Sequence, residues 1–185
     1  MRVIGGELSG RRFSGPGKLP VRPTGDNVRE SLFGILGRAV EDKMVLDLFA
    51  GVGSLGIEAL SRGAKAAVFV EAEPRTARII RENLETLGLS GRARILILPV
   101  TRALRKLEKE GGKFDLVFLD PPYEQGLAEP VLTWLSCSVI LSPDGVVILE
   151  HGAREKIKPR YDSLARGWEK RYGSKMISGF NFFNT

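Results

Sequence analysis

The sequence contains few residues that form disulfides or bind metals. Its 185 residues include one cysteine, Cys137, and one histidine, His151. A single cysteine excludes an internal disulfide and any metal site built from several cysteines, and it agrees with a reducing compartment. We interpret Cys137 as a small core residue and His151 as a structural histidine, and we expect no metal site.

Long apolar runs are also missing. No run approaches the roughly 20 residues needed to cross a bilayer, and the start, Met1-Arg2-Val3-Ile4-Gly5-Gly6, lacks the apolar stretch of a signal peptide. We therefore expect a cytoplasmic protein. The composition, 43% hydrophobic and 27% charged, excludes disordered and collagen-like classes. The length fits one domain.

Positive charge is concentrated at the two ends of the chain. The formal net charge is +6, from 28 basic and 22 acidic residues. Residues 1–38 hold 7 basic and 3 acidic side chains and residues 151–185 hold 8 and 3, whereas residues 39–150 hold 13 and 16. This distribution indicates an acidic catalytic core between basic flanks that contact a polyanion. The alternative is that these lysines and arginines only solubilise the surface.

Apolar periodicity predicts strands that alternate with helices. Residues 1–24 predict a basic N-terminal arm with a short β-hairpin, which is an extension rather than an independent domain, and residues 25–185 predict the main domain. Strands alternating with helices imply a parallel sheet covered on both faces. We expect a doubly wound α/β fold whose mostly parallel, seven-stranded sheet has an antiparallel hairpin at one edge. The expected strands are 44–49, 66–71, 93–98, 114–119, 146–150, 167–172 and 175–183; the expected helices begin at Asp26 and Pro74 and cover about 54–62, 101–109 and 126–135.

The loop after the first expected strand has the glycine spacing of a nucleotide-binding turn. Gly51, Gly53 and Gly56 form G-x-G-x-x-G at the start of a helix, where a ligand can approach the backbone and bind free N–H groups. A tight structural turn would show the same glycines. Glu71 ends the second strand 20 positions after Gly51, a spacing that suits a carboxylate bound to ribose hydroxyls. These features indicate a nucleoside ligand without deciding between NAD and S-adenosylmethionine (SAM).

The end of the fourth expected strand favours methyl transfer. It reads Asp120-Pro121-Pro122-Tyr123. The two prolines fix the backbone and remove two N–H donors, so this edge presents the Asp120 carboxylate and the Pro121 carbonyl as acceptors. Such acceptors can receive both hydrogens of an aromatic amine and free its lone pair, while Tyr123 stacks on the base. An ordinary turn with an outward tyrosine is the alternative.

Together these motifs resemble the class I SAM-dependent amino-methyltransferases. The N-terminal segment narrows the resemblance to the bacterial 16S rRNA (guanine(966)-N(2))-methyltransferase family. The resemblance runs from Arg2 to about Glu150 and fades in the last 35 residues. It implies a Rossmann-like fold. The residues that carry it are 47–53, 120–123, Arg22-Pro23-Thr24, Asp26, Arg29, Glu30 and Phe33.

The resemblance also implies roles for individual residues. The methionine part of SAM would contact Phe49, Ala50, Gly51 and Gly53, with Asp47 near its ammonium group. Glu71 would hold the ribose, Asp120 and Pro121 the target amine, and Tyr123 the base. Residues expected to border the pocket or bind RNA phosphates are Arg2, Arg11, Arg12, Lys18, Arg22, Thr24, Arg29 and Glu30. Relatives often bind the adenine amino group with an Asp or Asn after the third strand, but this chain has Pro99 there, so that contact stays unassigned.

The expected function is therefore direct methyl transfer from SAM to guanine N2 in 16S rRNA. The reaction needs neither metal nor covalent intermediate, and the expected partner is the small ribosomal subunit or its assembly intermediate, bound by a monomer. Three alternatives stay open. An N6-adenine methyltransferase shares the Asp120 motif, an NAD(P)-dependent dehydrogenase shares the glycine loop, and a non-catalytic RNA-binding module shares the fold.

Overall fold

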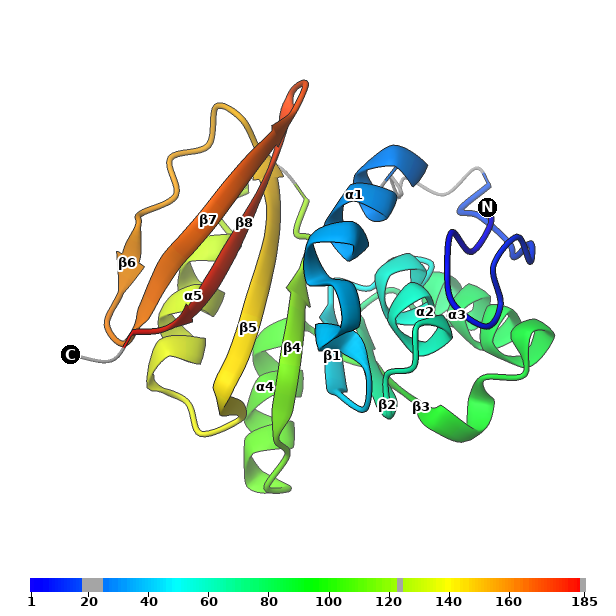
Figure 1. The fold of residues 1–185 in the computed structure, drawn as a ribbon. Coiled ribbons are helices and arrows are strands. Elements are labelled where there is room, and N and C mark those ends of the chain that lie inside the picture. The colour runs from blue at the N-terminus through cyan, green and yellow to red at the C-terminus, as the bar shows by residue number, and fades with distance from the viewer. Residues whose placement is uncertain (18–24, 123–124, 184–185) are drawn as a thin grey trace.

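The computed structural model describes residues 1–17, 25–122 and 125–183, and these form one twisted sheet with helices on both faces (Figure 1). Eight strands lie in the order β3-β2-β1-β4-β5-β8-β7-β6. The first five in that order pair in parallel, and the last three add antiparallel pairs. The strands are β1 (Met44–Leu48), β2 (Ala66–Glu71), β3 (Ala93–Ile97), β4 (Phe114–Leu119), β5 (Leu141–Gly152), β6 (Arg160–Tyr161), β7 (Leu164–Tyr172) and β8 (Lys175–Phe182).

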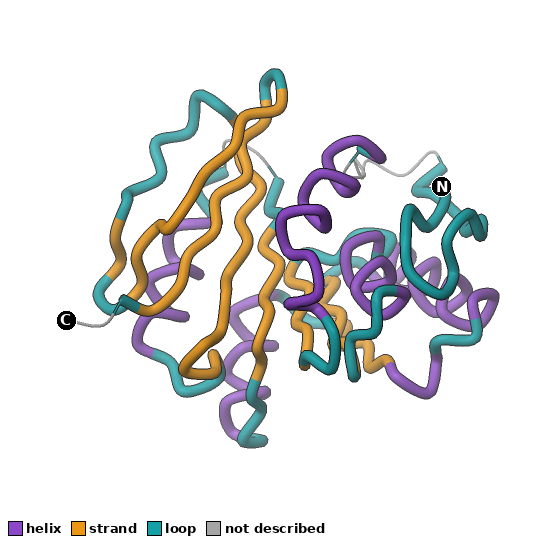
Figure 2. The backbone as a smooth tube through the Cα atoms, in the orientation of Figure 1, coloured by secondary structure: helices purple, strands orange, loops and turns teal. Residues whose placement is uncertain are grey.

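Five α-helices make the outer layers, and the tube view shows them on either side of the sheet (Figure 2). Apolar residues of the first three pack in a core with one face of the sheet, and those of the last two pack in a second core with the other. Two short 3-10 helices, Gly37–Val40 and Ser90–Arg92, precede β1 and β3. The α-helices are α1 (Asp26–Leu36), α2 (Ser54–Ser61), α3 (Pro74–Leu87), α4 (Val100–Lys109) and α5 (Ala128–Cys137).

Strand pleating explains why the same strand contributes side chains to both cores. Along β4, Phe118 lies in the α1 face core, whereas Val117 and Leu119 lie in the opposite one, because successive side chains of a strand point to opposite faces. All three are fully buried, as expected for a strand covered on both sides. The doubly wound, mostly parallel fold with an antiparallel edge hairpin is confirmed.

The expected number of seven strands is wrong. The additional strand, β6, has two residues and pairs only with β7, through Arg160 opposite Ala165 and Tyr161 opposite Leu164. Two residues are too few to show an alternating pattern, so the sequence carries no signal for this strand.

The described part of the N-terminal segment, residues 1–17, packs on the domain. Val3 and Phe13 are buried in the α1 face core. The backbone N–H groups of Ile4 and Gly5 each donate to the Glu58 carboxylate of α2 at 2.8 Å. The expected hairpin is reduced to a single antiparallel bridge between residues 2 and 12, outside the named strands. In the described residues, no helix is both long and apolar enough to cross a membrane.

Candidate functional site

Strand register brings the three expected site loops to one edge of the sheet. Leu48, the last residue of β1, lies opposite Val70 of β2 and Leu119 of β4. The loop that follows β1, the end of β2 and the loop that follows β4 therefore lie side by side at the carboxyl edge of the parallel strands. In doubly wound folds this edge is where ligands bind.

The loop after β1 has a backbone that only a few residue types adopt without strain. Phe49, Gly51 and Gly53 have φ values of 59°, 56° and 84°, all in the left-handed region. Phe49 is strained there, because its Cβ makes this conformation costly, and strained residues of this kind cluster at ligand sites. Gly53 caps α2, whose first N–H groups face the same edge.

Gly56, the third glycine of the motif, sets the distance between α2 and the sheet. A Cβ atom at this position would lie 2.3 Å from the Phe69 ring of β2. The absence of a side chain therefore lets the helix approach the sheet closely enough to position the loop. This packing is the role that the last glycine has in dinucleotide-binding turns.

The Glu71 carboxylate holds the glycine loop in place. It accepts the backbone N–H of Gly51 at 2.9 Å and, through its other oxygen, the N–H of Glu73 at 2.9 Å. Ionised carboxylates have about four acceptor positions, so two hydrogen bonds leave capacity for the hydroxyls of a ribose. Glu71 is only partly buried, which keeps that capacity accessible.

Asp47 is a buried carboxyl group directly below the loop. Its side chain is 2% exposed and accepts the N–H of Gly56 at 2.9 Å. Burial raises the pKa of Asp47 to about 7, although the Gly56 hydrogen bond lowers it; the charge of Glu71 adds to the rise. A ligand ammonium group would offset this burial cost by pairing with the carboxylate. Asp47, the glycines and Glu71 thus fit the methionine and ribose parts of SAM.

The loop after β4 contains the remaining expected site residues at the carboxyl edge of the sheet. Asp120 is partly buried and Pro121 is buried. Beneath them, Phe118 packs on Phe33 of α1 with ring centroids 5.7 Å apart, which fixes α1 against this strand. The expected base-stacking residue, Tyr123, lies outside the described residues.

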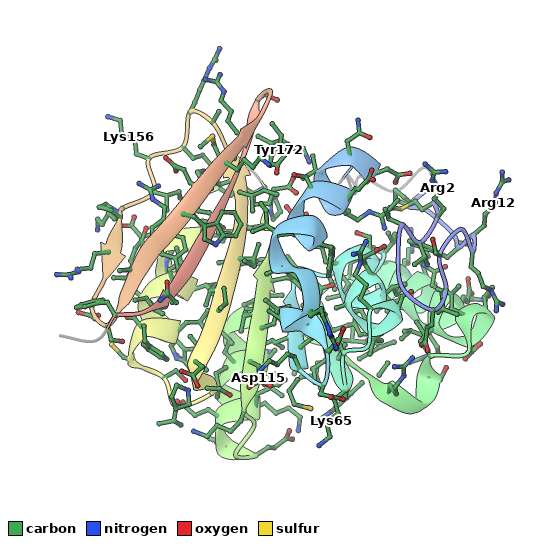
Figure 3. The ribbon with its side chains drawn as sticks, viewed as in Figure 1. Arg2, Arg12, Lys65, Asp115, Lys156 and Tyr172 are labelled. Atoms are coloured by element: carbon green, nitrogen blue, oxygen red, sulfur yellow. The ribbon has the colours of Figure 1, made fainter. Side chains whose placement is uncertain are left out.

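Three of the expected RNA-binding arginines lie on the surface. Arg2, Arg11 and Arg12 are exposed, and Arg2 and Arg12 point outward from the N-terminal segment (Figure 3). The Arg2 guanidinium pairs with Asp26 at 3.2 Å, an exposed pair that contributes little to stability. The expected site residues Lys18, Arg22 and Thr24 lie outside the part of the chain that the structure describes.

Arg29 is placed inside the protein rather than on the expected pocket border. Its side chain is fully buried. The guanidinium donates to the Arg2 carbonyl at 2.8 Å and to Asp26 at 2.7 Å, and it lies 3.9 Å from Glu58. Arg29 therefore ties the N-terminal segment to α1 and α2, and in this conformation it has no surface for RNA. A buried charge needs such partners.

Two charged residues near the edge were not predicted from the sequence. Glu150 of β5 and Lys175 of β8 form a buried ion pair. The position of Glu150 at the end of an expected strand, like that of Glu71, was a signal for this carboxylate, but no local pattern indicated its pairing with Lys175. His151 is buried and bonded to Ser178 at 3.0 Å, which agrees with a structural histidine. Cys137 is exposed, so its interpretation as a core residue is wrong.

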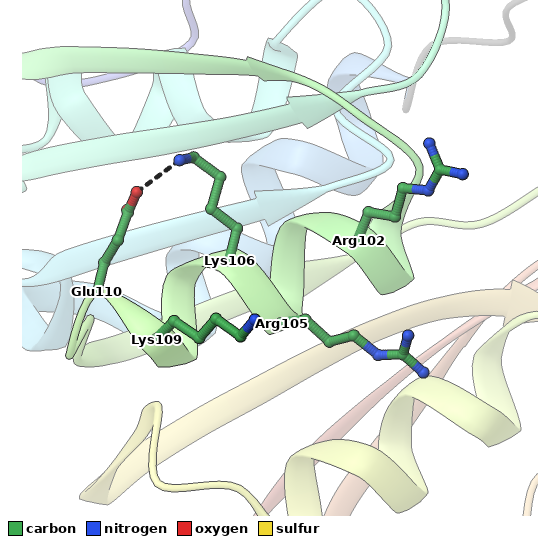
Figure 4. Close-up of a pocket in the computed structure, with 5 residues that line it drawn as sticks. All are labelled: Arg102, Arg105, Lys106, Lys109 and Glu110. Atoms are coloured by element: carbon green, nitrogen blue, oxygen red, sulfur yellow. Dashed lines mark ion pairs between the residues drawn. The ribbon is translucent and has the colours of Figure 1, made fainter.

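Residues 39–150 are acidic in total, yet they form a basic surface that their summed charge does not show. A shallow cleft of about 340 Å³ lies along α4 (Figure 4). Arg94 and Lys106 bind Glu110 and lower its pKa to about 2. Positive charge is therefore not confined to the flanks. The cleft is lined by Arg102, Arg105, Lys106, Lys109 and Glu110.

The fold and this edge define the class: a doubly wound α/β protein with a nucleoside-type site. The chain belongs to the family described as "Conserved hypothetical protein 95", whose model matches residues 1–181. It is 37% identical over 150 residues to "Ribosomal RNA small subunit methyltransferase D" of Escherichia coli (strain K12), covering 81% of this chain and 74% of that protein. The Haemophilus influenzae protein of that name is 38% identical over 159 residues, covering 86% and 81%.

A solved structure agrees with this assignment. A hypothetical protein of Thermus thermophilus matches with a TM-score of 0.84 and 30% identity, covering 98% of this chain and 99% of that one. The resemblance to an rRNA methyltransferase family is thus confirmed, and the family model extends to residue 181, beyond the point where the motifs fade.

Proposed function

We propose that this protein methylates the exocyclic N2 amine of a guanine in small-subunit rRNA, with SAM as the methyl donor. The observation that carries the proposal is the meeting of the glycine loop, Glu71 and the Asp120-Pro121 edge at one end of the sheet. Relatives that share at least 37% identity are named for methylation of small-subunit rRNA.

Each part of the edge has a task in this reaction. The α2 N-terminus, Asp47 and Glu71 bind and orient the cofactor, which supplies an electrophilic methyl group on a sulfonium. Asp120 and the Pro121 carbonyl accept the two amine hydrogens, so the nitrogen lone pair points toward the methyl carbon. The bound cofactor would supply the methyl group, with the C–S electron pair leaving on sulfur, and the proton released by the methylated amine would pass to water or to the Asp120 carboxylate.

Positioning supplies most of the rate enhancement in this scheme. A guanine amine is a weak nucleophile because its lone pair is delocalised into the ring. Well-aligned intramolecular reactions gain roughly 7–11 kcal/mol from proximity and orientation alone. Asp120 therefore need not act as a strong base, since the amine becomes acidic once it is methylated.

A dehydrogenase is the alternative that the glycine loop and Glu71 would also suit. That function gives no role to the acceptor edge at Asp120 and Pro121. Thermal shift measurements separate the two: SAM should raise the melting temperature by an amount that grows with the logarithm of its concentration above Kd, and NAD should not. Stabilisation by NAD alone would refute the proposal.

Labelled SAM then tests the substrate class. With small ribosomal subunits, naked rRNA and DNA in parallel, label should enter RNA and not DNA. Asp120→Ala should bind SAM as the unmodified protein does and transfer no label. Labelling of DNA only, or full activity of Asp120→Ala, would contradict the mechanism.

A further inference from the structure

Two acidic residues occupy matching positions at the proposed site: Asp120 directly follows β4, and Glu150 lies in β5, one residue after the last pair of the β4–β5 register. Phe118 of β4 is in register with Ile148 of β5, and both belong to the core on the α1 face. Asp120 and Glu150 each come two residues later, so strand alternation places both on that same face. Glu150 is thus the direct neighbour of Asp120 at the carboxyl edge.

A lysine from the next strand adjoins this pair. Lys175 begins β8 opposite Gly152, and Ile177, two residues on, lies in the α1 face core. The Lys175 ammonium forms an ion pair with the Glu150 carboxylate, and their side chains are only 11% and 4% exposed. From β4 through β5 to β8, the charged groups are therefore the Asp120 carboxylate, the Glu150 carboxylate and the Lys175 ammonium.

A buried ion pair of this kind is poorly explained by stability. Removing two charges from water costs several kcal/mol per ion, and apolar residues of similar size are often as stable. Buried charge partners that border a binding edge are candidates for function. The adjoining Asp120 motif suits any aromatic amine, so it does not by itself select guanine over adenine.

We propose that Asp120, Glu150 and Lys175 read the Watson–Crick edge of the target guanine. Guanine presents two amine hydrogens at N2, one hydrogen at N1 and an acceptor at O6. These groups match in order the Asp120 carboxylate with the Pro121 carbonyl, the Glu150 carboxylate and the Lys175 ammonium. Enzymes that flip a base commonly recognise it by hydrogen bonds to this edge.

The same array rejects adenine. Adenine N1 has a lone pair instead of a hydrogen, so it would face the Glu150 carboxylate with no proton between them. Two acceptors that face each other without a hydrogen repel, so a site built to bind an N–H group discriminates strongly against analogues without it. The inference rests on the proposed function, and it assigns base selectivity to Glu150 rather than to the Asp120 motif.

The test uses a target base that keeps the reacting amine but changes its neighbours. Transcribed rRNA is prepared with guanosine or with 2,6-diaminopurine riboside at the mapped position. The analogue keeps the 2-amine, replaces N1–H by a lone pair and O6 by an amine. The unmodified enzyme should prefer guanosine by at least about 100-fold in kcat/KM.

Glu150→Gln should reduce that preference below about 10-fold, since a glutamine amide can either accept from N1–H or donate to N1. Glu169→Gln, an exposed glutamate on β7, is the matched control and should keep the full preference. If Glu150→Gln fails to fold, the double variant Glu150→Gln/Lys175→Met, which removes both charges, takes its place. SAM binding by calorimetry establishes that each variant is folded.

The outcomes separate this inference from the proposed function. Formation of N2-methylguanosine together with an unchanged preference in the Glu150 variants would overturn base reading by Glu150 and leave the function intact. If the unmodified enzyme produces no N2-methylguanosine, the proposed function fails and the inference fails with it. A loss of preference only in the Glu150 variants supports the inference.

The basic surface on α4 carries a second, independent inference. Arg102, Arg105 and Lys109 recur at helical spacing and are exposed. Among the described residues these three have no ion-pair partner, whereas Lys106 is paired with Glu110. Helix α4 starts just after β3, so the row begins near the carboxyl edge and extends about 10 Å from it.

We infer that this row binds backbone phosphates of the RNA whose base occupies the site. Binding is measured on naked rRNA as a function of salt for Arg102→Gln/Arg105→Gln/Lys109→Gln. The salt slope should fall by up to about 2, the value for three released counterions on single-stranded RNA. The control Arg75→Gln/Arg78→Gln/Arg81→Gln removes equal charge from exposed positions on α3. Equal slopes for the two triple variants would overturn the inference.

Discussion

Replacing Asp47 by asparagine should stabilise the ligand-free protein at neutral and alkaline pH. The pKa of this carboxyl is raised by burial from an ordinary value of 3.8 to about 7. The folded state thus binds a proton that the unfolded state has lost, and stability falls as pH rises toward 7. Each unit of pKa difference corresponds to about 1.36 kcal/mol, so the group costs about 4 kcal/mol once it is ionised.

Asparagine keeps the acceptor for the Gly56 N–H and cannot ionise. Urea unfolding without SAM, followed by circular dichroism, gives the free energy of unfolding of both proteins from pH 5 to pH 8. The advantage of Asp47→Asn should grow by about 2–3 kcal/mol between pH 5 and pH 7 and then level off. A difference between the two proteins that does not change with pH would refute a raised pKa at Asp47.

Three further variants test other parts of the account. Asp120→Ala should lower kcat below detection, a fall of at least about 100-fold, while the SAM dissociation constant stays within twofold, as measured by steady-state kinetics and calorimetry. Arg11→Gln/Arg12→Gln should reduce the salt slope of RNA binding by up to about 1.4, and an unchanged slope would exclude them as phosphate contacts. Gly56→Ala should lose about 1–3 kcal/mol in urea unfolding because its Cβ would lie 2.3 Å from the Phe69 ring.

The parallel core of the fold could be predicted because its signals are local. The continuously apolar segment 114–119 indicated a strand buried on both faces, and β4 has those bounds. Pro74 and Gly88 predicted the ends of α3, and Gly88 adopts a φ of 72° there. Strand ends in a parallel sheet share one edge, so the expected positions of Glu71 and Asp120 followed from chain order alone.

The features that could not be predicted depend on contacts between distant segments. The family resemblance placed Arg29 on the pocket border, and charged residues are usually exposed. Its burial depends on how the N-terminal segment packs over α1. The ion pair of Glu150 with Lys175 depends on the antiparallel register of β5 and β8, which no local pattern reveals.

The central claim is transfer of a methyl group to guanine N2, and the identity of the modified nucleoside tests it most directly. Small ribosomal subunits and naked rRNA are incubated with the enzyme and labelled SAM, and the RNA is digested to nucleosides for chromatography and mass spectrometry. The account predicts that the label is recovered as N2-methylguanosine, and that Asp120→Ala yields none. Label recovered as N6-methyladenosine, or no label in RNA, would contradict it.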